Sequence, residues 1–315
     1  MQPSAGRVLA LAGGVGGAKL ALGLSRILPP ERLTVVVNTG DDEEVHGLHV
    51  SPDLDTAMYT LAGIENPATG WGLRDDTFRT LDALEQLGGD TWFRLGDADI
   101  ATHLRRTELL STGMTLSRVT SELCDRLGVQ CTLAPMSDDR VRTVALTDAG
   151  EMAFQEYFVH RRCEPILSGL RFDGVETAAP SPAFQAALRE AAVLVFCPSN
   201  PFVSVGPILA VPGVREAVAG LSGARVAVSP IIGGQAVKGP AAKMLVELGE
   251  EPSATAVARR YRGLCDVFVL DEVDAALAPE VAALGMRPAI TQTLMLSEYD
   301  KVELARLVLK VAEGG

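Results

Sequence analysis

Residues 7–19 read RVLALAGGVGGAK, and this stretch decides the fold. A mostly apolar run, Arg7–Ala12, is followed by a glycine-rich loop that ends at Lys19. Residues 18–28 then carry apolar side chains at helical spacing and stop at Pro29-Pro30, where a helix cannot continue. The order strand, glycine loop, helix is typical of the first unit of a parallel α/β sheet.

Further strands of the same kind follow along the chain. Short β-branched runs, each ended by a turn-forming residue, lie at 33–38, 193–197, 226–229 and 267–270. They alternate with helical patterns, the last at 301–311, and this alternation predicts crossover helices between parallel strands. The predicted fold class is α/β, a Rossmann-like and mostly parallel sheet with a large mixed helical and β insertion.

The segment between the second and third of these strands does not follow the pattern. We interpret residues 51–190 as an inserted acceptor-binding subdomain, and residues 1–50 with 191–315 as a nucleotide-binding domain. Inside the insertion, the spacing predicts a helix at 115–127 and antiparallel strands at 129–134, 141–146 and 152–159.

Composition excludes several classes of protein. The 315 residues carry a formal net charge of −12, which repels a nucleic-acid backbone, so no nucleic-acid partner is expected. The five cysteines are widely spaced, form no Cys-x-x-Cys pair and lack an activating motif. We therefore expect buried thiols in a reducing compartment. No apolar run approaches the roughly 20 residues that span a bilayer, so no membrane association and a cytoplasmic protein are expected.

The glycine loop suits an anion. Gly13, Gly14, Gly16 and Gly17 let backbone N–H groups approach a phosphate at the start of a helix. The loop matches neither the dinucleotide pattern, because Lys19 replaces the third glycine, nor the P-loop, because no Ser or Thr follows. A tight turn that binds no ligand is the alternative.

Carboxylates gather after the second strand. Asn38 ends that strand, where a nicotinamide-dependent enzyme would usually place an acidic residue. Asp41 and Asp42 follow it, and Asp53 and Asp55 lie at a predicted helix start. Oxygen ligands at this density suit Mg²⁺, with Asp41, Asp42 and Asp55 as the candidate ligands. Alternatively, Asp53 and Asp55 only complement the helix N-terminus.

Two later strand ends add polar loops at the same edge of the predicted sheet. Ser199 and Asn200 follow the third strand, and residues 229–234 follow the fourth. Ligands of open parallel sheets lie outside the carboxyl ends of the strands, so these loops and the glycine loop are expected to converge. Their side chains could bind a phosphate or a purine, or act as ordinary turn residues.

Aromatic residues and one histidine stand out in the insertion. Trp71 and Trp92 could stack on a flat heteroaromatic ligand, although a tryptophan is more often part of a core. His103, on a helix predicted at 99–106, is a candidate general base or, more commonly, a packed histidine.

Taken in this order, the segments resemble the 2-phospho-L-lactate transferase family of coenzyme F-420 biosynthesis. The most specific are Ser-Pro-Asp-Leu-Asp-Thr at 51–56 and Leu-Gly-Asp at 95–97, and the resemblance covers essentially the whole chain. It implies a Mg²⁺-dependent homodimer that transfers a phosphoenolpyruvyl or 2-phospholactyl group from its guanosine diphosphate adduct. The acceptor would be a hydroxyl of the deazaflavin Fo, and GMP would leave.

The resemblance also implies that Asp55 and Arg94 contact the deazaflavin. The predicted catalytic residues are Asp41 and Asp55, and the predicted substrate-binding set is Gly13, Gly14, Gly16, Gly17, Asn38, Asp55, Arg94, Ser199 and Asn200. Two alternatives stay open. A nucleotide-sugar-binding metabolic regulator of a related branch would keep the glycine loop but would not need the Asp53 and Asp55 pair. A nicotinamide-dependent dehydrogenase is disfavoured by Lys19 and Asn38.

Overall fold

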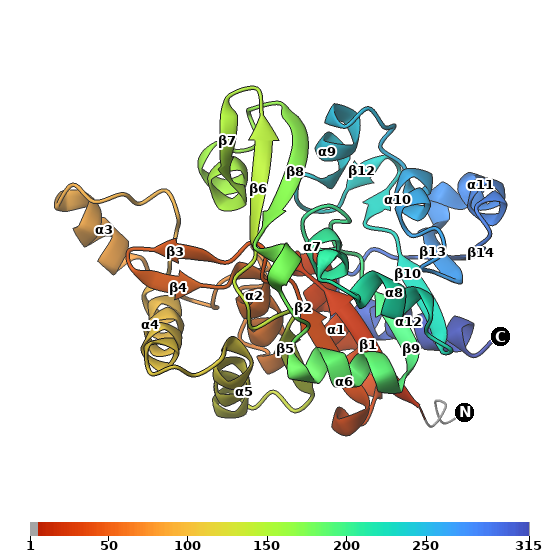
Figure 1. Ribbon diagram of the computed structural model, residues 1–315, viewed down its shortest axis with the longest axis horizontal. Helices are drawn as coiled ribbons and strands as arrows, with labels where there is room; N and C mark the ends of the chain where they lie inside the picture. The colour runs from red at the N-terminus through yellow and green to blue at the C-terminus, as the bar shows by residue number, and fades with distance from the viewer. Residues whose placement is uncertain (1–5, 315) are drawn as a thin grey trace.

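The computed structural model describes residues 6–314, and β1 (Arg7–Ala12) lies inside its central sheet (Figure 1). This sheet has seven strands in the order β14-β13-β10-β9-β1-β2-β5, and every neighbouring pair is parallel. Its other strands are β2 (Leu33–Val37), β5 (Thr132–Pro135), β9 (Ala191–Phe196), β10 (Ala224–Val228), β13 (Val267–Asp271) and β14 (Arg287–Thr291). The predicted α/β class with a parallel sheet is confirmed.

Helices cover both faces of the sheet, which is why its inner strands are apolar throughout. One face packs against α1 (Gly14–Ile27), α2 (Pro52–Ala62), α5 (Leu116–Leu127) and α12 (Glu298–Ala312), and the other against α6 (Pro182–Glu190), α7 (Val205–Ala210), α8 (Val214–Ala219) and α10 (Ala254–Arg260). Successive side chains of β1 point to opposite faces of the sheet: Ala12 packs with the first group of helices and Leu11 with the second. Both are fully buried.

The remaining elements extend from this sheet. They are the hairpin β3 (Glu43–Val45) and β4 (Leu48–Val50), the helices α3 (Arg79–Gln86) and α4 (Asp97–Ser111), and the antiparallel sheet of β6 (Arg142–Thr147), β7 (Gly150–Ala153) and β8 (Leu167–Asp173). A short hairpin, β11 (Ile231–Ile232) and β12 (Gln235–Ala236), precedes α9 (Ala241–Glu247), and α11 (Ala278–Ala283) precedes β14. Figure 1 shows the β6–β8 sheet standing apart from the central sheet.

Several predicted elements were wrong in kind or in extent. Residues 129–134 were expected in an antiparallel pair, whereas Thr132–Pro135 forms β5 and pairs in parallel with β2 at the edge of the central sheet. Residues 152–159 were expected as one strand, but β7 ends at Ala153 and Glu156–His160 is helical. The helical turn buries Phe154 and Tyr157 together, which the alternation of a strand would not allow.

Two further predictions, the helix at 115–127 and the buried thiols, are confirmed. The helix predicted at 115–127 is α5, and the side chain of Thr115 accepts a hydrogen bond from the backbone N–H of Arg118 as its N-cap. All five cysteines are buried and unpaired. Among the described residues, no helix is long and apolar enough to cross a membrane. The division of the chain at residues 51 and 190, and the homodimer, stay predictions.

Candidate active site

A cavity of about 700 Å³ lies where the carboxyl ends of the central strands meet the insertion. Its sheet side is formed by residues that follow β1, β2, β9, β10 and β14: Gly13, Gly14, Gly16, Asp41, Ser199, Asn200, Ser229, Pro230, Thr293, Leu294 and Met295. Its other side is formed mostly by the segments around Trp71, Trp92 and Phe158. The predicted convergence of the strand-end loops at one edge of the sheet is thus observed.

The structure brings most of the predicted site residues to this cavity. Those that line it are Gly13, Gly14, Gly16, Asp41, Asp55, Arg94, Ser199 and Asn200. Gly17, Asn38 and Asp42 lie behind the lining. Gly17 permits close packing, because a Cβ there would stand 2.6 Å from the Ser199 Oγ. Asn38 and Asp42 are buried among polar partners.

The glycine loop offers fewer free N–H groups than its sequence suggests. The N–H of Gly13 donates to the Ser199 Oγ at 3.0 Å, and the N–H of Gly14 donates to Asp53 Oδ1 at 2.8 Å. Gly16 is needed because a Cβ there would collide with the carbonyl of Pro198. What remains for an anion is the first turn of α1, where the N–H groups of Val15 and Gly16 have no acceptor inside the helix.

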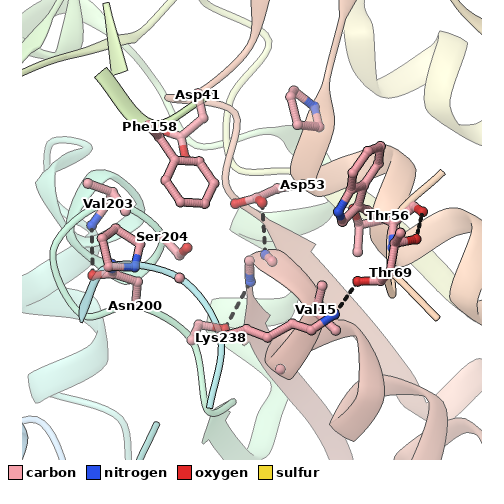
Figure 2. Close-up of a pocket in the computed structure, with 18 of the residues that line it drawn as sticks. Val15, Asp41, Asp53, Thr56, Thr69, Phe158, Asn200, Val203, Ser204 and Lys238 are labelled. Atoms are coloured by element: carbon pink, nitrogen blue, oxygen red, sulfur yellow. Dashed lines mark hydrogen bonds between the residues drawn. The ribbon is translucent and has the colours of Figure 1, made fainter. Parts of the chain in front are cut away.

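Asp53 is the site residue that the sequence analysis did not select. It lines the cavity, and its carboxylate joins two loops: Oδ1 accepts from Gly14, and Oδ2 accepts from Asn38 Nδ2 at 3.0 Å. The Asn38 Oδ1 in turn accepts from the N–H of Gly40 at 2.8 Å. Figure 2 shows Asp41 and Asp53 directed toward the same open space. A helix-start aspartate usually serves its own helix, so the sequence alone gave no reason to prefer it.

Asp41 and Asp53 form an acidic pair, and neither makes an ion pair with a cationic side chain among residues 6–314, although the charge of Arg142 acts on Asp41 from farther away. Burial raises the pKa of Asp41 well above its ordinary value, and the charge of Asp53 raises it further. Burial raises the pKa of Asp53 to about 6, although the hydrogen bonds from Asn38 and Gly14 act to lower it. Asp41 Oδ1 is buried and has no hydrogen-bond partner among residues 6–314. The pair is therefore a position at which a bound cation would lower the free energy.

The other two candidate metal ligands differ from this pair. Asp42 Oδ2 accepts from the Ser51 hydroxyl at 2.9 Å and lies 3.0 Å from His49 Nε2. Its Oδ1 is buried without a hydrogen-bond partner among the described residues, but Asp42 does not line the cavity. Asp55 forms a buried two-point ion pair with Arg106, in which Nη1 meets Oδ2 at 3.1 Å and Nη2 meets Oδ1. The charge of Asp55 is thus balanced by the protein itself.

His103 belongs to the Asp55 network. Its Nδ1 lies 3.2 Å from Arg106 Nη1, and because a guanidinium can only donate, Nδ1 is the acceptor. The proton of a neutral ring is then on Nε2, which lies 3.3 Å from Asp99 Oδ1. Tyr59 donates to the same Asp99 oxygen at 2.6 Å. His103 is 1% exposed, and these contacts favour the packed histidine over the general base.

Cationic and aromatic side chains occupy different parts of the wall. Lys19 Nζ donates to the carbonyl of Met295 at 2.8 Å, and burial together with Lys301 and Lys238 lowers the pKa of Lys19. Lys238 contacts the carbonyl of Thr69 across the cavity (Figure 2). No sequence pattern marks Lys238, since only the packing of the two loops brings it to the site.

The aromatic part of the wall comes from the insertion. Trp92 stacks on His160 with ring centroids 5.1 Å apart, and Phe158 stacks on Phe154 at 5.6 Å. Trp71 and Phe158 remain 46% and 37% exposed, so their rings are accessible to a ligand. The Arg94 guanidinium lies 4.2 Å from the centroid of the Phe78 ring.

Comparisons of the sequence and the fold relate the chain to known proteins. The sequence model of the family described as 2-phospho-L-lactate transferase CofD matches residues 8–310. The phosphoenolpyruvate transferase of Streptomyces griseus is 46% identical over 313 residues, and the 2-phospho-L-lactate transferase of Methanopyrus kandleri is 42% identical over 311, each match covering 98% of both chains. A crystal structure of a UPF0052-family protein from Bacillus halodurans has a TM-score of 0.63 at 16% identity, covering 96% of this chain and 98% of that one. At that identity the likeness is one of fold.

Proposed function

Because the chain belongs to the 2-phospho-L-lactate transferase CofD family and is a transferase of coenzyme F-420 biosynthesis, we propose its full reaction. It transfers a phosphoenolpyruvyl or 2-phospholactyl group from the guanosine diphosphate adduct to a hydroxyl of the deazaflavin Fo, and GMP leaves. The observation that carries the proposal is the division of one cavity into a side with a glycine loop and two lysines, an acidic pair and an aromatic wall.

The sheet side of the cavity suits the donor. The first turn of α1 presents N–H groups to it, and Lys19 and Lys238 add positive charge in a protein whose net charge is −12. Ser199 and Asn200 lie next to the glycine loop, with Ser199 held by Gly13. We therefore assign the diphosphate to this side.

The insertion side suits the acceptor. A deazaflavin is flat and aromatic, and the exposed rings of Trp71 and Phe158 offer faces on which it can stack. Asp55 and Arg94 also line the cavity, in keeping with contacts to the same substrate. The acceptor hydroxyl would then lie between the aromatic wall and the acidic pair.

The residues present fit a magnesium ion. Mg²⁺ typically takes one or two carboxylates and completes its shell with water and substrate phosphates, so two ligands from the protein suffice. Asp41 and Asp53 would hold it, because both line the cavity, both have raised pKa values and Asp41 Oδ1 lacks a partner. Among the described residues, no group of three or more His, Cys, Asp or Glu side chains could hold a metal by itself. When bound, the ion would neutralise charge on the phosphoryl oxygens.

The reaction is an in-line displacement at phosphorus. The acceptor oxygen forms a bond to the phosphorus that carries the organic acid, the bond to the GMP oxygen breaks, and the hydroxyl proton passes to a cavity carboxylate, Asp41 or Asp55. N–H groups at the start of α1 and the ammonium of Lys19 would meet the charge on the phosphoryl oxygens. Because the cavity is partly buried, these interactions would be stronger there than in bulk water.

A direct assay tests the proposal. The protein is incubated with Fo, Mg²⁺ and either guanylylated phosphoenolpyruvate or guanylylated 2-phospholactate. GMP and a more acidic deazaflavin are expected in equal amounts, and the mixture without Fo is the control. Absence of product with both donors, together with tight binding of a nucleotide sugar, would instead support the regulator.

Magnesium is expected to stabilise the protein more as pH rises. The raised pKa values of Asp41 and Asp53 mean that the folded state resists their ionisation, so their contribution to stability falls as pH rises from the ordinary carboxyl value through about 6. Mg²⁺ binds only when both carboxyl groups are ionised, and its charge offsets the free energy that their ionisation costs in the folded state. The increase in melting temperature caused by Mg²⁺ should therefore be larger at about pH 7.5 than at about pH 5.

The measurement is thermal unfolding with Mg²⁺ and with a chelator at both pH values. In the Asp41→Asn and Asp53→Asn double variant the increase should vanish. An increase that is independent of pH, or that persists in the double variant, would place the ion elsewhere.

A further inference from the structure

A second cavity, of about 460 Å³, shares a loop with the first. Pro201 and Phe202 line the second cavity, whereas Asn200 and Val203 line the first. The loop is fixed between them, because Asn200 Oδ1 accepts from the N–H of Phe202 at 2.9 Å. The reaction proposed above gives this second cavity no role.

Its walls are apolar and its charged groups are all of one sign. The lining residues come from β8, α7, α8, α10 and the loops that follow β9, α9 and α10: Leu170, Phe172, Pro201, Phe202, Gly206, Leu209, Ala210, Arg215, Leu248, Arg260 and Tyr261. Both charged members of this set, within the described part of the chain, are arginines. The whole protein carries 40 acidic and 28 basic side chains, so an all-cationic cavity departs from its general charge.

The two arginines retain unused capacity to donate. The exposed guanidinium of Arg215, on α8, makes no ion pair, hydrogen bond or ring contact with any residue in 6–314. Arg260, on α10, pairs with Glu250 and stacks 4.0 Å from the centroid of the Phe202 ring. Its Nε is nevertheless buried without a partner within the described chain. A guanidinium offers five donors in a planar fork that matches an oxyanion.

An unpartnered hydroxyl belongs to the same lining. The ring of Tyr261 stacks on Phe196 with centroids 4.8 Å apart, and its hydroxyl is buried with no hydrogen-bond partner among the described residues. Burial raises the pKa of Tyr261, so the hydroxyl stays protonated and can donate. Buried polar groups left unpaired cost free energy, and two of them, on Arg260 and Tyr261, belong to residues of this one cavity.

We propose that the second cavity is a binding site for a small organic oxyanion, a carboxylate or phosphate carried on an apolar body. The oxyanion is held by Arg215 and Arg260, and the apolar body packs against Phe172, Leu209 and Leu248. The site is distinct from the reaction cavity and touches it through the loop that carries Asn200.

Equilibrium binding to the full-length protein tests the proposal, with benzoate and phenyl phosphate as probes. Titration calorimetry should show saturable binding of at least one, and comparison of the two separates a carboxylate site from a phosphate site. Arg215→Gln should weaken binding about tenfold, because it removes a charged donor from the anion. Arg118→Gln, which changes an exposed arginine on α5, is the matched control and should leave binding unchanged.

A second pair of variants changes only the charge of the wall. Ala210 lines the cavity, so Ala210→Glu should abolish probe binding while Ala210→Gln, of similar size, should retain it. Lys19→Gln, which changes the first cavity, should leave probe binding unchanged. The proposal is overturned by equal binding to the Glu and Gln variants, by full binding to Arg215→Gln, by loss of binding in Lys19→Gln, or by no saturable binding at millimolar concentrations.

Discussion

Asp41→Asn is expected to lower kcat by about a thousandfold or more while the protein stays folded. Asp41 lines the reaction cavity, and one of its oxygens is buried with no partner among residues 6–314. The amide keeps the shape of the side chain but removes the charge that the proposed ion and the transferred proton require. Because burial and Asp53 already oppose ionisation of Asp41, removing the charge should leave the melting temperature equal or higher.

The measurement is turnover of Fo with saturating donor, alongside thermal unfolding. Asp82→Asn is the matched control, because Asp82 is exposed on α3 and does not line the cavity. Asp53→Asn should resemble Asp41→Asn. Normal turnover in Asp41→Asn would remove this residue both from metal binding and from proton transfer.

Arg106→Met is expected to destabilise the fold by about 3–5 kcal/mol, because it leaves the carboxylate of Asp55 buried without its partner. Arg106 is 2% exposed and Asp55 is 5% exposed, and their contact is two-pointed. Arg106 also donates a hydrogen bond to His103 Nδ1, so the substitution leaves this ring nitrogen without its donor. Chemical denaturation gives the free energy of unfolding.

The neighbouring residue supplies the control. Arg105 pairs with Glu108 and Glu122 at the surface of α4, so Arg105→Met should cost less than about 1 kcal/mol. The double variant Arg106→Met with Asp55→Asn should recover part of the loss, since the unpaired charge is gone. Equal costs for the Arg105 and Arg106 variants would contradict the argument.

The fold was predictable where periodicity and position agree. The apolar run before the glycine loop, and the runs near 33, 193, 226 and 267, all became strands of the parallel sheet. β14 was not predicted, because it contains Pro288 and proline is uncommon in strands. The proline is tolerated here because β14 lies at the edge of the sheet. β8 escaped because Gly169 and Arg171 interrupt its apolar pattern.

The site was predictable in its location and less so in its residues. Strand-end loops of a parallel sheet converge by geometry, so Asp41, Ser199 and the glycine loop could be placed together from the sequence. Asp53 and Asp55 lie two residues apart on one helix and both line the cavity, and no local rule says which of them forms the ion pair with Arg106. That choice depends on contacts with distant segments.

The position of β1 also decides when this protein can finish folding. Leu9 in β1 pairs with Leu194 in β9, so β1 gains one of its two neighbours only after the second half of the chain has been synthesised. β1 can pair early with β2, but closing the long loop to β9 costs entropy before that second pairing forms, which slows folding. Until residue 196 has been synthesised, one edge of this apolar strand is open to other chains. The nascent protein is therefore most exposed to aggregation while its middle portion is being made.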